Sequence, residues 1–397
     1  MTAGYPITGA AIANCLGATN DTVFERAFSG ADAFSPATGF HAFPFATVLG
    51  IMPASPVTDR LDCVPTRQAT VALASVAQLR PAVSAAVERW GANRVAYVFA
   101  SSTGGLEETE RALAPDPRLA LSGAEYRYAD HAIDATSAAI AHHLGVTGVT
   151  MAISTACSSS FKALASAARL IDRGLADAVV VGSADSLCRT TVFGFHSLGL
   201  TAPTATQPFA RDRVGLTLGE GSAYIVIERD SDATARRAIA RVSGIGAASD
   251  AFHHTSPHPE GLGGQLCMRQ ALDRAGLTPN EIDYVSAHGT GTKLNDAAEA
   301  AAVTRVFERR VPLTATKSLT GHTLGSAGLT ALVLAIESLR RQEIPATLRL
   351  APVDDTLGMA VVDRRTAARI QHVLVNAFGF GGSNASVVVS APMARRS

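Results

Sequence analysis

Short, continuous runs of β-branched and other apolar residues are the feature that most constrains how this chain can fold. They predict strands over residues 94–102, 149–154, 176–186, 222–229, 240–249, 283–292, 372–380 and 385–390. Helical patterns lie between them, over residues 67–90, 131–144, 158–173, 264–275, 297–307 and 326–342. Strands that are apolar on both faces must be covered on both faces. The sequence therefore predicts an α/β fold with helices on both sides of its sheets.

The length of the chain, 397 residues, favours two or three domains or one large domain in two parts. A charged segment without strong periodicity, residues 228–242, indicates a boundary near its middle. We therefore predict an N-terminal half, residues 1–235, and a C-terminal half, residues 236–397. Both halves hold strands and helices in a similar order, which would suit a duplicated unit, although no convincing sequence repeat supports it.

Charge and cysteine content exclude several classes of protein. The formal net charge is zero, which argues against a nucleic-acid binder held by bulk charge. The 47% of hydrophobic residues argue against disorder. Five cysteines without any CxxC pair make a disulfide framework or a zinc site improbable, so no metal is expected. A reducing cytoplasm fits this pattern best.

The chain also lacks the patterns of targeting and membrane segments. Its apolar start has no Lys or Arg before Arg26, whereas a signal peptide needs a positive first region. The apolar run at residues 325–336 is too short and too rich in small residues to cross a bilayer. We therefore expect no membrane span and interpret this run as a buried helix.

The stretch "STACSSSFKAL" places Cys157 between a predicted strand and a predicted helix, among small hydroxyl residues. A free thiol with a pKa of about 8.5 is only a few per cent thiolate at neutral pH, and a helix N-terminus lowers that pKa. The small neighbours would leave room for a substrate. This stretch alone is equally compatible with a reactive nucleophile and with a buried, inert cysteine.

A nucleophilic cysteine needs partners, and two histidines in turns rich in glycine and threonine are candidates. His288 lies in "SAHGTGTKLNDAAE", directly after a predicted strand, and His322 lies in "TKSLTGHTLGSAG" before a predicted helix. Either could instead be a hydrogen-bonded structural residue. The late stretch "NAFGFGGSN" alternates Phe378 and Phe380 with glycines. It predicts either a tight loop with two core aromatics or a backbone N–H close to a substrate oxygen, guarded by a ring.

Together these stretches resemble the β-ketoacyl-acyl-carrier-protein synthases of the type I/II branch. The resemblance is carried, in order, by "STACSSS", "AHGTGTKLNDAAE", "TKSLTGHTLGSAG" and "NAFGFGGSNAS". The stretches "ITGAAIANCLG", "LGEGSA" and "DAFHHTSP" match as well, so the resemblance covers nearly the whole chain. It implies a thiolase-like layered fold of two pseudo-duplicated α/β halves, usually a homodimer, that performs decarboxylative Claisen condensation.

The resemblance also implies roles for individual residues. Cys157 would take an acyl group from a carrier-protein thioester, and His288 and His322 would assist malonyl decarboxylation and stabilise the resulting enolate. Phe380 matches a mobile gate between the acyl and malonyl pockets, and its amide with that of Cys157 would form an oxyanion hole.

Four further residues match supporting positions of the family. Lys317 and Glu299 match a charged pair behind the histidines that would orient them and set the local field, although a purely structural ion pair is the alternative. Thr290 and Thr292 match positions that hydrogen-bond the phosphopantetheine arm. The substrates travel on the phosphopantetheine of acyl carrier protein, so no separate cofactor is expected.

The chain departs from the family pattern in one loop, and three other kinds of protein must be compared with it. The usual "PFDxxRDG" reads "PFARDRVG" here, with Ala210 and Val214 in place of two acids, which puts any loop network of those carboxylates in doubt. A thiolase proper would carry a second cysteine in "NAFGFGGSN", and a type III synthase would carry asparagine where His322 stands. A non-catalytic chain-length-factor-like subunit would typically lack the nucleophile, whereas Cys157 remains.

The expected partner is acyl carrier protein, which is acidic and therefore needs a local basic patch near the pocket mouth. Arg67, with Arg60 nearby, begins an early helix that resembles the docking element, although both can equally be ordinary solvated charges. The pathway can be fatty-acid elongation or specialised polyketide or aryl-polyene synthesis, and the altered loop favours the specialised one. A homodimer is expected, and a heterodimer with a related subunit is the alternative.

Overall fold

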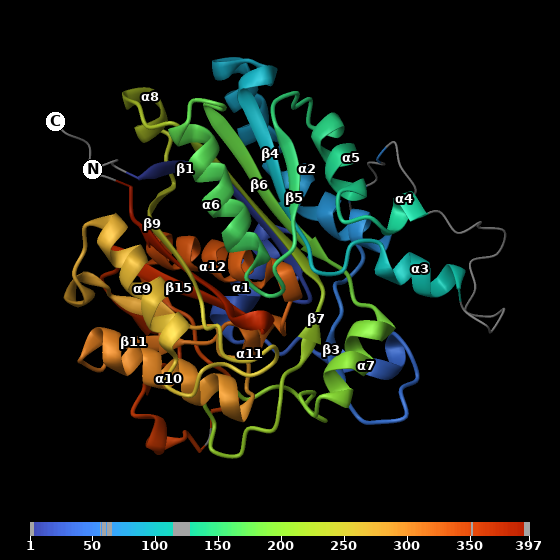
Figure 1. Cartoon of the computed structure of the whole chain (residues 1–397), viewed down its shortest axis with the longest axis vertical. Coiled ribbons are helices and arrows are strands. Elements are labelled where there is room, and N and C mark those ends of the chain that lie inside the picture. The colour runs from blue at the N-terminus through green and yellow to red at the C-terminus, as the bar shows by residue number, and fades with distance from the viewer. Residues whose placement is uncertain are drawn as a thin grey trace.

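The structure is a computed structural model that describes residues 4–55, 57, 61, 66–113, 128–350 and 352–392 (Figure 1). Its largest sheet contains β1 (Tyr5–Asn14), β4 (Val95–Ala100), β5 (Thr150–Ile153), β6 (Ala178–Asp185), β8 (Gly221–Glu228), β9 (Ala240–Ser249), β10 (Tyr284–Ser286), β11 (Pro312–Thr314), β13 (Ala360–Val361), β15 (His372–Gly379) and β16 (Ser383–Ser390). Two small sheets contain β2 (Ser35–Pro36), β3 (Val48–Gly50) and β7 (Leu218–Gly219), and β12 (Glu343–Ile344) and β14 (Thr366–Ala367).

The helices alternate with these strands along the chain. They are α1 (Asn20–Ser29), α2 (Arg67–Trp90), α3 (Leu106–Ala112), α4 (Tyr128–His131), α5 (Ala135–His143), α6 (Ser159–Asp172), α7 (Arg189–Ser197), α8 (Asp232–Ala235), α9 (Leu262–Ala275), α10 (Lys293–Phe307), α11 (Lys317–Thr320) and α12 (Ala327–Arg341). Two single-turn 3₁₀ helices, η4 (Leu324–Ser326) and η6 (Phe380–Gly382), lie beside the site described below.

The two halves of the chain repeat one strand topology. The large sheet has the order β13-β11-β10-β15-β16-β9-β1-β8-β6-β4-β5. In the N-terminal half, β4 pairs in parallel with β5 and β6, and β8 pairs antiparallel with β6 and β1. In the C-terminal half, β10 pairs in parallel with β11 and β15, and β16 pairs antiparallel with β15 and β9. Numbered within its own half, each set of five strands has the order 3-2-4-5-1, as a duplicated unit would.

Helices and sheets form five layers because successive strand residues face different cores. On β4, Ala96 and Val98 belong to a core shared with α6 and α12, whereas Val95 and Tyr97 pack with α2 and α5. The C-terminal half repeats this arrangement, with α12 on one face and α9 and α10 on the other. In Figure 1 the central pair α6 and α12 lies between the two halves. The predicted α/β fold, with thiolase-like layers of two related halves, is confirmed.

Most predicted elements are present, and the differences have local causes. The predicted helix at residues 131–144 is two helices, α4 and α5, and the strand predicted at 283–292 is only β10. The strand β1 was not predicted because "YPITGAAIAN" has few β-branched residues, yet it pairs with β8 and β9. By length and composition α2 alone among the described helices is long and apolar enough to cross a membrane. Its face toward β4 and β6 is buried in the core, as in the core helix of a folded domain.

Candidate active site

Cys157 occupies a strained turn between β5 and α6. The preceding Ala156 has φ 52°, a left-handed conformation that costs a residue other than glycine about 1–2 kcal/mol. The Ala156 carbonyl accepts hydrogen bonds from the hydroxyls of Ser102, at 3.1 Å, and Ser159, at 2.5 Å, and these help to hold the turn. Helix α6 begins at Ser159, so the Cys157 sulfur lies just before its N-terminus, 7% exposed.

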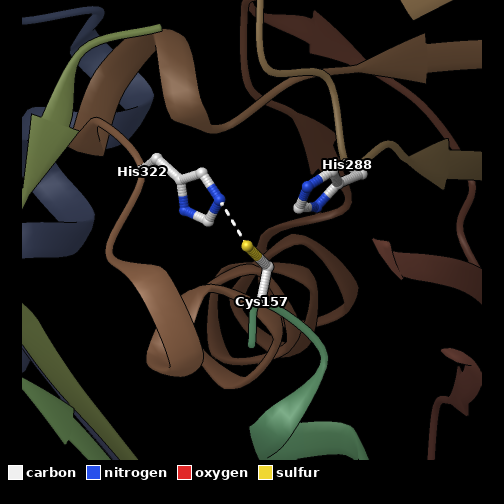
Figure 2. A group of neighbouring side chains, drawn as sticks. All are labelled: Cys157, His288 and His322. Carbon is white, nitrogen blue, oxygen red and sulfur yellow. Dashed lines mark hydrogen bonds between the residues drawn. The ribbon is translucent and has the colours of Figure 1, made fainter. Parts of the chain in front are cut away.

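His322 is held against the sulfur by its backbone and by its ring. Its N–H donates to the Thr217 carbonyl at 2.7 Å, and its carbonyl accepts from the Gly219 N–H at 3.0 Å. Its Nε2 lies 3.1 Å from Cys157 Sγ (Figure 2). The Leu324 N–H donates to its Nδ1 at 3.1 Å. Because Nδ1 accepts, the ring proton belongs on Nε2, and the neutral ring presents a donor to the sulfur.

His288 brings a second imidazole ring close to the same sulfur. It follows β10, and its ring stands almost perpendicular to that of His322, at 86°, with the ring centroids 5.4 Å apart (Figure 2). Lys317 Nζ lies 3.1 Å from His288 Nδ1 and donates to the His288 carbonyl at 2.6 Å. The Lys317 ammonium has only donors, so His288 Nδ1 accepts and its Nε2 also carries a proton. Two imidazole N–H groups therefore face one point.

Glu299 supports the site differently from the predicted pair with Lys317. Its Oε1 accepts from the His288 N–H at 2.7 Å and from Asn376 Nδ2 at 3.0 Å, and its Oε2 accepts from the Gly289 N–H at 2.7 Å. Among the described residues, no salt bridge within 4 Å joins Glu299 to Lys317. The carboxylate acts on Lys317 through its field alone, because its oxygens are already taken by backbone and amide donors.

Burial dominates the electrostatics of this site. It raises the pKa of the Cys157 thiol to about 11, against the opposing effects of the Lys317 cation and the Phe380 N–H. The lowered thiol pKa expected from the sequence is therefore wrong, because desolvation outweighs the helix terminus. Burial also lowers the pKa of His288 and His322 well below the usual value, with Lys317 adding to the effect, so both rings are neutral at pH 7. The pKa of Lys317 falls to about 8 for the same reason, while Glu299 opposes the fall.

The three side chains resemble a metal-binding set in composition. The ligand atoms of Cys157, His288 and His322 all lie within 4.8 Å of one another. Ligation through Nε2 would move each ring proton to Nδ1, where the Leu324 N–H or the Lys317 ammonium already donates. The donor set therefore suits an anionic oxygen better than a cation.

These side chains lie at the end of a pocket with a volume of about 170 Å³. Ligand pockets usually measure about 300–1,000 Å³, so this one is narrow. Thr290 and Thr292 line it and hydrogen-bond to each other at 2.9 Å, and their role in binding the arm stays a prediction. Phe380 also lines the pocket, and its N–H and that of Cys157 both lower the pKa of the Cys157 thiol. The structure thus brings together every predicted residue of the pocket.

The altered loop "PFARDRVG" is stabilised by carboxylates from other parts of the chain. Arg213 forms a salt bridge with Asp354 at 2.6 Å and lies 3.7 Å from the Asp296 carboxylate. Asp296 also accepts a hydrogen bond from the Phe209 N–H at 2.8 Å. Ala210 is buried and Val214 is 55% exposed, so neither position holds a polar network. The loop keeps its order through carboxylates of other segments.

Of the two predicted docking arginines, the structure describes Arg67 alone, and its guanidinium is held in an ion pair. Arg67 donates to Glu220, whose carboxylate is 2% exposed, and also to the Met52 carbonyl. This ion pair offsets the positive charge of Arg67, whose side chain is 30% exposed, and the docking role of Arg67 stays a prediction. Arg60 lies outside the described residues.

Three functional neighbours were missed by the sequence interpretation. Leu324 acts through its backbone N–H, which no sequence pattern reveals. Asp296 is fully buried and accepts from the N–H groups of Thr290 and Gly291, at 3.0 and 3.2 Å, and its place in "KLNDAAE" next to Glu299 was an available signal. Phe195, on α7, lines the pocket beside Phe380, and nothing in its local sequence distinguishes it from a surface residue.

Comparison with known proteins places this site in a family. The description "Beta-ketoacyl synthase, N-terminal domain" matches residues 57–233, and "Beta-ketoacyl synthase, C-terminal domain" matches residues 239–351. A 3-oxoacyl-[acyl-carrier-protein] synthase 2 from Vibrio cholerae is 37% identical over 62% of this chain, a match that spans 63% of that enzyme. The enzyme of the same name from Coxiella burnetii is 29% identical over 97% of both chains.

Solved structures agree across the whole length. A chain of the Xenorhabdus doucetiae ketosynthase in complex with its chain length factor is 33% identical, with a TM-score of 0.88 over 98% of both chains. A chain of the ishigamide ketosynthase/chain length factor is 27% identical, with a TM-score of 0.89 over 98% of this chain and 100% of the other. A β-ketoacyl synthase from Burkholderia phymatum is also 27% identical, with a TM-score of 0.85 over the same shares. With its nucleophile and two imidazole donors in one pocket, this chain belongs to the β-ketoacyl synthase family of condensing enzymes.

Proposed function

We propose that this ketosynthase carries an acyl chain as a thioester on Cys157 and lengthens it by two carbons with malonyl-acyl carrier protein. One observation carries the proposal: His322 Nε2 lies 3.1 Å from Cys157 Sγ, and His288 presents a second N–H to the same pocket. A non-catalytic subunit would have no use for a nucleophile set between two oriented donors. The chain-length-factor-like alternative is therefore not favoured.

Acyl transfer begins at the Cys157 thiolate, which is a minor species at neutral pH because burial raises the thiol pKa. The thiolate attacks the carbonyl carbon of the incoming thioester, a new C–S bond forms, and the C–S bond to pantetheine breaks. The pantetheine thiolate leaves and takes up a proton. The N–H groups of Cys157 and Phe380, which both lower the pKa of the thiol, would stabilise the transient oxyanion.

Decarboxylation then uses the two histidines. The malonyl C–C bond breaks, carbon dioxide leaves, and the electron pair forms an enolate whose charge is on the thioester oxygen. The N–H groups of His288 and His322 donate to that oxygen, and each such donor is typically worth about 10²–10³ in rate. The enolate carbon attacks the acyl carbonyl on Cys157, a C–C bond forms, and the Cys157 thiolate is released.

The substrates reach the site on a carrier protein. Thr290 and Thr292 line the pocket and have hydroxyl groups placed to bond the amides of a phosphopantetheine arm. The steps above need no other cofactor and no metal. We place the reaction in the cytoplasm, where the described cysteines, all free and buried, would stay reduced.

A related subunit is the partner that we propose for this chain. β5 ends the large sheet, and its residues are only partly covered. An open sheet edge of this kind is normally covered or paired. Two of the solved relatives are titled as complexes of a ketosynthase with a chain length factor, which supports a heterodimer and a specialised polyketide-type pathway. Native mass spectrometry of the purified chain, alone and co-produced with a candidate subunit, distinguishes a heterodimer from the homodimer expected from sequence.

Mass spectrometry of the loaded enzyme tests the reaction. The chain is mixed with octanoyl-acyl carrier protein, and the intact mass is expected to rise by one octanoyl group that maps to Cys157. Cys157→Ala should abolish the adduct, whereas Cys267→Ala should keep it, because Cys267 is buried against Ser386 away from the pocket. A folded wild-type chain without an adduct contradicts the proposal. Repeating the assay with saturated and unsaturated chains of different length would identify the preferred acyl group.

Cys157→Gln provides a second test. The glutamine fills the place of the acyl-cysteine while the two histidines stay intact, so malonyl decarboxylation should continue and condensation should stop. Loss of both activities in a folded variant would mean that the two histidines do not decarboxylate independently of the thiol.

A further inference from the structure

Helix α7 is mostly exposed, but one of its aromatic side chains, that of Phe195, lines the pocket. Val192 is the only buried residue of this helix, and Phe195 is half-buried. The Phe195 ring lines the pocket, with its centroid 5.5 Å from that of Phe380 and 6.5 Å from that of His322. It is therefore in contact with the proposed gate and close to the reacting groups.

Both ends of α7 are fixed, so Phe195 stands on a rigid support. At the N-terminal end, the Glu110 carboxylate accepts from the N–H groups of Arg189, at 2.8 Å, and Thr190, at 2.5 Å. These are backbone donors that a helix leaves unsatisfied at its start. At the other end, the His196 ring stacks on Phe45 with the centroids 3.4 Å apart and the planes within 4°.

The backbone that follows Phe380, in contrast, contains two glycines and no side chain that could fix the ring. Gly381 and Gly382 follow it in left-handed conformations, with φ 76° and 69°, and an added Cβ at Gly381 would meet no atom within 4 Å. The Gly381 N–H donates to the His254 carbonyl at 2.8 Å, and the Gly382 carbonyl accepts from the Asp250 N–H at 2.9 Å, so both glycines are held by residues 250–254. Among the described aromatic side chains, Phe195 alone has a ring packed against that of Phe380.

We propose that Phe195 is a positioning residue that holds the Phe380 ring closed over Cys157 and so keeps water from the acyl-enzyme. The proposal rests on the acyl-cysteine of the proposed function and on the gate that the family resemblance implies for Phe380. A packed aromatic pair favours the closed position by about 2- to 12-fold. The pocket is narrow, about 170 Å³, while both rings line it. Loss of the Phe195 ring removes the contact that favours the closed position of the Phe380 ring.

The consequence is a leak that can be measured. When the gate opens without a malonyl donor, water attacks the acyl carbonyl on Cys157, the C–S bond breaks, and a carboxylic acid and the Cys157 thiol are released. Phe195→Ala should therefore raise the rate of hydrolysis of octanoyl-Cys157 by about 3- to 10-fold. The initial rate of loading should not fall, because a gate that opens more often also admits the acyl donor.

The experiment follows the mass of the octanoyl-enzyme over time after the donor is removed by gel filtration. Phe193→Ala is the matched control, because Phe193 stands on the same helix but packs on Phe43 and Phe45, with centroids 5.1 and 5.6 Å away, and does not line the pocket. Its adduct should last as long as that of the wild type. Phe195→Leu, which keeps most of the volume, should restore a lifetime between those of the wild type and Phe195→Ala, and it replaces the alanine variant if that one does not fold.

A double-mutant cycle tests whether Phe195 acts through the gate. In a Phe380→Ala background, Phe195→Ala should cause no further increase in hydrolysis. An unchanged adduct lifetime in folded Phe195 variants, or an equal effect with and without the Phe380 ring, would overturn the inference. If the wild-type chain forms no adduct on Cys157, the proposed function itself fails, and the two failures are thus distinguished.

Discussion

Replacement of Glu299 by glutamine isolates what the buried carboxylate does for His288. Three donors converge on its two oxygens: His288 N–H and Asn376 Nδ2 on Oε1, and Gly289 N–H on Oε2. The amide of Glu299→Gln has one oxygen. In the better orientation this oxygen keeps two bonds, and the NH₂ group faces the Gly289 N–H at 2.7 Å, donor against donor.

The cost follows from that count. An unsatisfied buried N–H costs about 1–3 kcal/mol, and the two remaining bonds lose the extra strength that a charged acceptor gives them. Relief from burying a charge, which here raises the pKa of Glu299, offsets part of this. We expect the free energy of unfolding to fall by about 2–4 kcal/mol in urea titrations. His288 should also shift, and malonyl decarboxylation at pH 7 should slow by about 10- to 100-fold.

The pH profile provides the sharper test. Protonated Lys317 donates to His288 Nδ1 and so keeps the ring proton on Nε2. Malonyl decarboxylation by the wild type should therefore fall as the pH rises through the Lys317 pKa of about 8. Glu299 raises that pKa, and its neutral replacement should therefore move the alkaline limb to lower pH. Glu228→Gln serves as control, because this buried carboxylate binds Arg89 and Trp90 far from the pocket. An unmoved limb in Glu299→Gln, or the same shift in the control, would refute the reasoning.

Three further substitutions probe the surroundings of the site. Asp185→Asn should lower the free energy of unfolding in urea by about 2–4 kcal/mol, because its NH₂ group would face the Ser326 N–H that Oδ2 now accepts, and the four bonds to Oδ1 would lose a charged acceptor; an unchanged midpoint would speak against this network. Arg67→Gln should cost about 3–5 kcal/mol, because it leaves Glu220 buried and unpaired, while carrier-protein affinity, measured by titration calorimetry, stays constant. Weakened carrier binding by this variant in a folded state would instead support the docking role predicted for Arg67. Gly289→Ala should lower the thermal midpoint, because its φ is 40° and the new Cβ would lie 2.6 Å from that of Ala315; a wild-type midpoint would contradict this.

The sequence was informative where the physics is local and less so where it depends on distant contacts. Apolar runs such as residues 176–186 predicted β6, because a strand buried on both faces needs them. The turn residues around Cys157, His288 and His322 marked the pocket. By contrast, Glu299 bonds to backbone groups instead of forming the expected ion pair, and this depends on how α10 docks against the turn after β10.

Other misses have the same origin. The ring proton of His322 is set by the Leu324 N–H, a backbone group that every residue type supplies. The Phe195 ring reaches the gate only because α7 packs beside a segment almost two hundred positions later in the chain. The thiol pKa of Cys157 depends on total burial, which a helix N-terminus in the sequence does not reveal.

The repeated strand order has a consequence for the growing chain during translation. The thiol belongs to the first copy of the unit, whereas both imidazoles and the Phe380 amide come from the second, ahead of the last strand β16. A nascent polypeptide that has completed only its first copy thus holds the cysteine without either imidazole donor. Decarboxylation and condensation must therefore wait until the second copy has been synthesised and has packed against the first.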